Sequence, residues 1–287
     1  MLSLLTFTIT KISYLALEDE TVAGAKRKYI EAAYELLARD GLEGVSIRKV
    51  ADEVGCSSAA LYRHFPDIDK LVAVASIRFL EDYIEDARLL SKVDLNPLEL
   101  NLQLWECLAF YSFRNADVFE NLFFGSVDGG LYTEAVIEYF EEYPEVLIGL
   151  KDFMLNMFQK ATTIAERDSV LLNRAVECGM LSRDSAAYLC RIDSYLFRGM
   201  LADVCGRDLE EEDFRWITRE FMDLVIRSYT LQLESGYSIL VVKSDFDASK
   251  QGSGTDVRSS YRVETIPKKR VSTGKGVYGR QLQKSSA

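Results

Sequence analysis

The stretch CSSAALYRHF, residues 56–65, joins a run of small residues to a group of side chains that can form polar and stacking contacts. Tyr62, Arg63 and His64 offer a hydroxyl, a guanidinium and an imidazole at adjacent positions. Small residues allow a helix backbone to approach a large partner closely, and the N-terminus of a helix favours anions such as phosphate. The stretch therefore predicts a surface that docks on a large partner.

Residues suited to catalysis or to metal binding are few. His64 is the only histidine, and the sequence shows no convergent carboxylate pair and no Gly-rich phosphate loop. The five cysteines are irregularly spaced and form no CxxC pair or Cys/His cluster, so neither a zinc site nor a disulfide framework is predicted. We expect no enzymatic activity, no metal and no cofactor, and the cysteine pattern fits a reducing cytoplasm.

Short helices must position this stretch, and their ends are marked in the sequence. Ser46 is placed to cap a short helix that Gly55 ends. Ser57 is placed to cap the next helix, which we expect to run to Phe65, because Pro66 disfavours helical geometry in the residue before it. Two short helices joined through a glycine predict a helix-turn-helix.

The segment IEAAYELLARDGLEGVSIRKVADEVGCSSAALYRHFPDIDKL resembles the DNA-binding segment of the TetR family of transcriptional regulators. The resemblance covers about residues 26–72 and rests on the paired alanines of the first helix, the serine before IRKVADEVG, the LYRHF motif and the closing Leu71. It implies an all-α fold with an N-terminal helix-turn-helix three-helix head plus a helical ligand-binding and dimerisation domain. It also implies a homodimer that represses transcription from an inverted-repeat operator of double-stranded DNA.

The resemblance also implies roles for individual residues. The residues expected to contact base edges are Arg48, Ser58, Ala59, Tyr62 and Arg63. The residues expected to contact phosphate are Ser46, Tyr62, His64 and Lys70.

Two positions depart from the family pattern. Ala59 stands where the family commonly has glycine, and Ile68 stands where it commonly has a phosphate-contacting lysine. Residues 26–72 contain as many acidic as basic residues, so the head has no net positive charge. These features leave open a second interpretation, in which the chain is a TetR-like small-molecule-binding module without specific DNA binding.

Helical spacing continues through the rest of the chain. The helices expected after Pro66 cover 69–90, 97–113, 116–125, 131–142, 145–164, 167–178, 183–204 and 209–234. Aromatic and methionine side chains on the central helices suit an apolar cavity for a small apolar or aromatic effector, and the candidate lining residues are Trp105, Phe110, Phe123, Tyr139 and Met157. Glu106 is read either as a counter-charge for a cationic ligand or as a solvated glutamate. The apolar faces of 183–204 and 209–234 predict a two-fold four-helix bundle between subunits.

The boundaries that we expect are an N-terminal extension (1–23), the head (24–72), the ligand-binding and dimerisation domain (73–236) and a tail (237–287). The tail is rich in Ser, Gly and Lys and shows no apolar period, so it predicts a disordered basic segment. No run of apolar residues is long enough for a membrane span.

Overall fold

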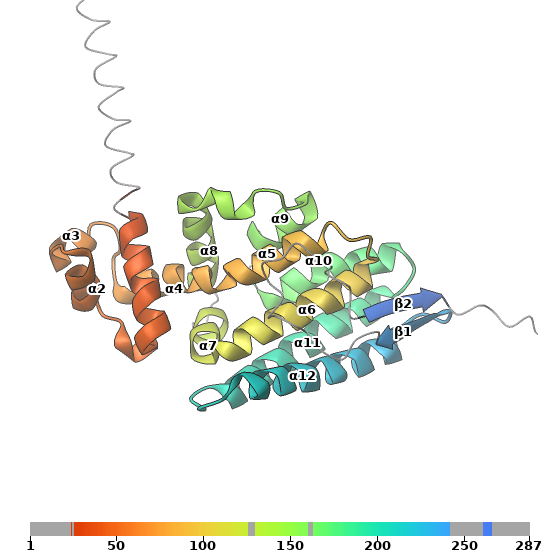
Figure 1. Cartoon of the computed structure of the whole chain (residues 1–287). Coiled ribbons are helices and arrows are strands. Elements are labelled where there is room, and N and C mark those ends of the chain that lie inside the picture. Colours follow the sequence, from red (N-terminus) through yellow and green to blue (C-terminus); the bar gives the residue numbers. More distant parts are fainter. Residues whose placement is uncertain (1–23, 25, 126–129, 160–162, 242–260, 266–287) are drawn as a thin grey trace, which may run out of the picture.

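The computed structural model describes residues 24, 26–125, 130–159, 163–241 and 261–265, and these residues are mainly helical, as predicted (Figure 1). The expected N-terminal extension and most of the expected tail lie outside the described residues. The head consists of a first helix over residues 26–40, η1 (Leu42–Gly44), α2 (Ile47–Val54) and α3 (Ser58–Leu61). Its core contains Ile30, Leu61 and Phe65, all without exposed surface.

The body follows from the head without interruption. Helix α4 (Ile68–Ser76) leads into η2 (Ile77–Leu80) and α5 (Glu81–Leu90), so the single helix expected over 69–90 contains a tighter 3-10 turn in its middle. The remaining helices are α6 (Pro97–Arg114), α7 (Ala116–Phe124), α8 (Gly130–Glu142), η3 (Pro144–Leu147), α9 (Asp152–Gln159), α10 (Ile164–Glu177), α11 (Arg183–Val204) and α12 (Glu211–Gln232).

Helix α6 is the centre of the body. Every residue from Leu100 to Phe113 is buried, which requires neighbours on all sides of the helix. Those neighbours are α5, α7, α10, α11 and α12, together with strand β2. Polar side chains of α6 are buried with the apolar ones and must find partners inside the body.

The prediction of one helix over 145–164 is wrong, because two separate helices, η3 and α9, lie in this segment. Pro144 begins η3, and the chain then turns at Gly149, whose φ of 83° lies in the left-handed region that favours glycine. Helix α9 begins beyond this turn, and Thr163 caps α10 with a hydrogen bond from the amide of Glu166. A local glycine conformation therefore separates helices that the apolar pattern had joined.

The tail also differs from the expectation. Residues Tyr237–Val241 form β1 and residues Tyr261–Thr265 form β2, which pair antiparallel at the end of the body far from the head (Figure 1). Val263 is buried, and its amide donates to Glu99 Oε1 of α6 at 2.9 Å. These residues are ordered because they cover the open side of α6.

Candidate functional site

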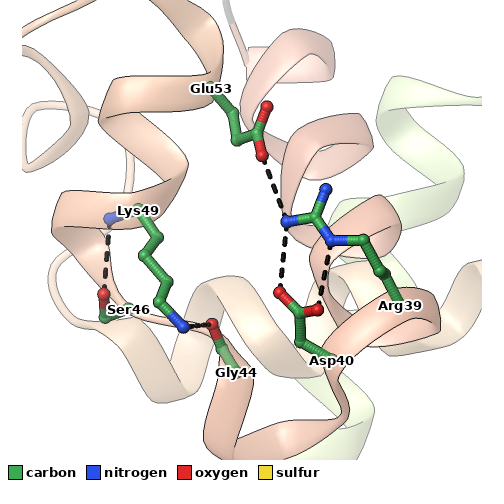
Figure 2. Close-up of polar contacts among 6 residues, drawn as sticks. All are labelled: Arg39, Asp40, Gly44, Ser46, Lys49 and Glu53. Carbon is green, nitrogen blue, oxygen red and sulfur yellow. Dashed lines mark hydrogen bonds and ion pairs between the residues drawn. The ribbon is translucent and has the colours of Figure 1, made fainter.

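The helix-turn-helix of the head is fixed by its own side chains. Ser46 Oγ accepts from the amide of Lys49 at 3.3 Å at the start of α2, as Figure 2 shows. Gly55 ends α2 with a φ of 73°, and Ser57 Oγ accepts from the amide of Ala60 at 3.2 Å. The predicted caps are confirmed, but α3 ends at Leu61 and turns replace the expected last helical turn before Phe65.

The polar residues of the opening stretch face solvent. Tyr62 is 54% exposed, and Ala59 and Arg63 are also exposed, while Ser58 is half-buried. Arg48 extends from α2 with 89% of its side chain exposed. The structure therefore places all five candidate base-contact residues on or near the surface of the two short helices.

His64 differs from these residues because it is partly enclosed. Its ring lies against that of Tyr29, with centroids 5.3 Å apart. Desolvation lowers the pKa of His64, and the nearby charges of Arg63 and Lys26 lower it further. The imidazole is therefore neutral at neutral pH in the free protein.

Ion pairs join α2 to the first helix. Arg39 binds Asp40 at 3.1 Å and Glu53 of α2 at 3.2 Å, and Lys49 Nζ donates to the carbonyl of Gly44 at 2.7 Å (Figure 2). The guanidinium of Arg39 therefore has its charge compensated within the head.

A lysine of the first helix and a lysine of α4 bind acidic residues of α8. Lys70 Nζ lies 2.9 Å from Glu134 and 3.3 Å from Glu138, both on α8, and its side chain is only 14% exposed. Lys26 of the first helix reaches Glu138 at 2.7 Å. We call this group of four residues the junction. Because Lys70 is held between two carboxylates, its ammonium is directed toward the body.

A small cavity lies inside the body between α5, α6, α9 and α10. Its volume is about 20 Å³, counted as the space open to the centre of a water molecule, which is enough for about one or two water molecules. Its lining residues are Tyr83, Asn101, Leu104, Trp105, Leu108, Met157, Ile164, Arg167 and Asp168.

Of the predicted cavity residues, Trp105 and Met157 line this space. Phe110, Phe123 and Tyr139 do not. Phe110 is fully buried and its ring lies beside that of Tyr111, while Phe123 packs on Tyr132. Aromatic composition indicated a region with a cavity, but most of the aromatic rings belong to the core around it.

Tyr139 and Glu106, which the sequence had suggested as possible ligand-binding residues, both have partners within the body. The Tyr139 hydroxyl donates to Glu81, and its ring stacks on Tyr143 at 4.7 Å. Glu106 is buried and accepts from Gln103 at 2.8 Å, so neither a solvated glutamate nor a cavity counter-charge describes it.

One end of the cavity is formed by a buried polar network that the sequence analysis missed. Asp168 Oδ1 accepts from Asn101 Nδ2 and from Trp105 Nε1, both at 2.8 Å. Asn101 also donates to the Tyr229 hydroxyl at 2.7 Å, which in turn donates to Asp193 Oδ2 at 2.8 Å. Polar residues on the buried faces of otherwise apolar helices were the signal that could have revealed it.

The two carboxyl groups of this network titrate at unusually high pH. Desolvation raises the pKa of Asp168 to about 6, although its hydrogen-bond donors oppose the shift. Desolvation and the charge of Asp168 raise the pKa of Asp193 well above its usual value. Burial and the neighbouring Asp168 therefore favour the protonated form of Asp193.

The capped pair of short helices with exposed polar side chains defines a DNA-binding helix-turn-helix protein. The family model described as "Bacterial regulatory proteins, tetR family" matches residues 30–75. This match confirms, over residues 30–75, the resemblance to the TetR family that the sequence indicated. No curated protein matches the chain at a significant level.

Solved structures of TetR-family and related regulators are similar over most of their length. FadR of Thermus thermophilus, solved with lauroyl-CoA, is 18% identical, with 71% of this chain and 92% of that chain covered and a TM-score of 0.47. A regulator of Haloarcula marismortui is 17% identical, with 73% and 98% covered and a TM-score of 0.48. A regulator of Saccharomonospora viridis, solved with choline, is 18% identical, with 74% and 98% covered and a TM-score of 0.47.

Within the described part of the chain, no group of three or more His, Cys, Asp or Glu residues is arranged to hold a metal ion. None of the helices in the described residues combines the length and the apolar character that crossing a membrane requires.

Replacing Asp168 by Asn should change how stability depends on pH. Because the pKa of Asp168 in the folded protein lies above its unfolded value, its contribution to the free energy of unfolding is complete below about pH 4 and is lost as pH rises through about 6. As pH rises from 5.5 to 7.5, the free energy of unfolding of Asp168→Asn should therefore increase relative to that of wild type by on the order of 1 kcal/mol. Urea unfolding measures both free energies.

The exposed Asp152 of α9 supplies the control for this experiment. Asp152→Asn should show the same pH dependence as wild type. A stability difference between wild type and Asp168→Asn that stays constant over this range would contradict the assignment.

Proposed function

We propose that the chain is a ligand-responsive transcriptional repressor that binds an inverted-repeat operator as a homodimer. The observation that carries the proposal is the exposed set of Arg48, Tyr62 and Arg63 on a capped helix-turn-helix within the segment that matches the TetR model. An arginine in the major groove can form a bidentate pair with guanine, which distinguishes one base pair from another.

The DNA contacts that we propose follow the exposure of each residue. Arg48, Ser58, Ala59, Tyr62 and Arg63 would meet base edges, and Ser46, Tyr62 and His64 would meet phosphate. Lys70, which the resemblance had assigned to phosphate, is left out because its ammonium is neutralised by two carboxylates of α8.

Helices α11 and α12 support a dimer. Tyr188 and Tyr195, seven residues apart on α11, are both exposed, and so are Leu224 and Leu231 on α12. Seven residues return to nearly the same face of a helix, so each helix presents large apolar side chains in a row. We propose that these rows meet their copies across a two-fold axis.

The body cavity supports the ligand response. It is bounded by α5, which is joined through η2 to α4, and α4 packs against the head. Enlarging the cavity for an effector would displace α5 and so the head. To move a repressor from mostly bound to mostly free, the effector must favour one arrangement by about 5 kcal/mol.

A second function has specific support from the charges of the head. Arg39 is paired within the head, Lys70 is paired with the body, and Arg48 Nε lies 3.8 Å from Asp52. Such neutralisation favours a small-molecule-binding module without specific DNA binding. Anisotropy titrations on DNA flanking its own gene separate the two functions, because the module would show no sequence preference.

Arg48→Ala should weaken binding and relax base preference at one symmetric position in each half-site, at a cost of about 1–3 kcal/mol. The measurement is fluorescence anisotropy on the operator and on its single-base variants. Arg39→Ala serves as the matched control, because Arg39 is an exposed arginine of the same head that binds Asp40 and Glu53. If Arg48→Ala keeps the wild-type base preference, the assignment of Arg48 is wrong.

Salt dependence should separate Arg63 from Lys70. Arg63 is exposed and forms no ion pair with any described residue, so its cation would add to the positive charge that displaces counterions from the duplex even while it meets a base edge, and Arg63→Ala should reduce the slope of log K against log salt by up to about one. Lys70→Ala should leave the slope unchanged. A reduced slope for Lys70→Ala would restore Lys70 as a phosphate contact.

Tyr195→Glu combined with Leu224→Glu should convert the dimer to monomers, because each subunit would bring two charges into an apolar interface. Analytical ultracentrifugation measures the outcome. Ile148→Glu, which alters a 71% exposed side chain outside α11 and α12, should leave the dimer intact. If the double variant sediments as wild type does, the interface lies elsewhere.

A further inference from the structure

Arg167 of α10 is a buried cation at the edge of the body cavity. Its residue is 4% exposed, and its Nη1 atom has no hydrogen-bond partner among the described residues. The guanidinium lies over the ring of Tyr83 at 5.2 Å and over the ring of Phe158 at 5.4 Å. No carboxylate of the described residues lies within ion-pair distance of it.

Burying a guanidinium without a counter-ion is costly, and aromatic rings compensate for only part of that cost. Desolvation lowers the pKa of Arg167, but the charge interactions and hydrogen bonds with Tyr83 and Tyr132 raise it by more, so the group stays cationic despite its burial. An unpaired donor on a buried cation is what an anionic ligand would complete. Structural packing would be served equally well by an apolar side chain of the same length.

The neighbouring carboxylate does not make the cavity a cation site. Asp168 Oδ1 already accepts from Asn101 and Trp105. Asp168 Oδ2 and Asp193 Oδ1 have no hydrogen-bond partner among the described residues. The donors of the network offset part of the desolvation of Asp168, and the charge of Arg167 also lowers its pKa, whereas Nη1 of Arg167 has no hydrogen-bond partner among the described residues.

Apart from Tyr83, Arg167 and the polar network at one end, the cavity wall is apolar. Leu104, Trp105, Leu108, Met157 and Ile164 form most of it, with the guanidinium at one side. Met157 on α9 is the most adaptable of these side chains, so the wall around it can move to admit a ligand larger than the free space.

We propose that the effector is a small organic acid whose carboxylate binds Arg167 and whose apolar or aromatic body packs between Trp105 and Met157. This inference rests on the proposed ligand response and names its chemical class. It differs from the cationic ligand considered for Glu106, which does not line the cavity.

The test uses acids and amides of matched shape. Benzoate, phenylacetate and hexanoate are each titrated against the full-length protein by calorimetry, beside their primary amides and benzylammonium. Wild type should bind at least one carboxylate about tenfold or more tightly than its amide, because a charged partner on a buried guanidinium strengthens the hydrogen bond. An amide or benzylammonium that binds as tightly as the best acid, or no binding of any acid at millimolar concentration, would overturn the proposal.

Variants of Arg167 then test if this residue causes the preference for acids over amides. Arg167→Met, which keeps the length of the side chain, should bind acid and amide equally well, and Arg167→Lys should retain a weakened preference for the acid. Arg174→Met removes an exposed arginine of the same helix and should keep the full preference. Because Arg167→Met could fail to fold, its far-UV circular dichroism is recorded. If the variant is unfolded, Arg167→Lys and the comparison of acids with amides on wild type test the proposal in its place.

An undiminished acid preference in a folded Arg167→Met would overturn the proposal. Operator binding is measured on the same wild-type preparations without added acid. Loss of sequence preference there would count against the repressor function, whereas loss of acid preference would count only against this inference.

Discussion

Helix α4 is the constraint on which the rest of the structure depends, because it belongs to the head and to the body at once. Leu71 through Ile77 are all buried, and seven consecutive residues cannot lie on one face of a helix. The helix must therefore be covered from more than one side, and Figure 1 shows it between the first helix and α8. The position of the DNA-binding head is consequently fixed by the packing of the body. Any change that moves α5 must move α4 with it.

The cationic side chains discussed above fall into three groups: exposed to solvent, ion-paired with α8, and buried. Arg48 and Arg63 remain in water, where a phosphate or a base edge can reach them. Lys26 and Lys70 form ion pairs with α8 in the junction, so carboxylates of the body neutralise part of their charge. Arg167 is buried, and its Nη1 atom has no hydrogen-bond partner among the described residues. A chain with a formal net charge of −11 thus keeps a few cations for specific positions, and its affinity for DNA depends on contacts and not on general attraction.

The head was predictable because its determinants are local. Ser46, Gly55 and Ser57 mark helix ends within a few residues of the structure they fix, and all three act as expected. What the sequence did not reveal involves distant partners. Lys70 contacts Glu134, which lies 64 residues away, and β2 pairs with β1, which precedes residues 242–260. The apolar period also could not reveal the turn at Gly149. Arg167 looked like any arginine of an amphipathic helix, since burial against α5 and α9 is a tertiary property.

Specific DNA recognition by a symmetric pair of heads is the central claim, and selection from a random duplex library tests it most directly. The full-length protein is incubated with the library at physiological salt, and bound duplexes are recovered, amplified and sequenced over several rounds. The account predicts enrichment of an inverted repeat whose half-sites are centred about one helical turn or more apart. Recovery of unselected sequence, with binding that disappears uniformly as salt increases, would contradict it and support the ligand-binding module.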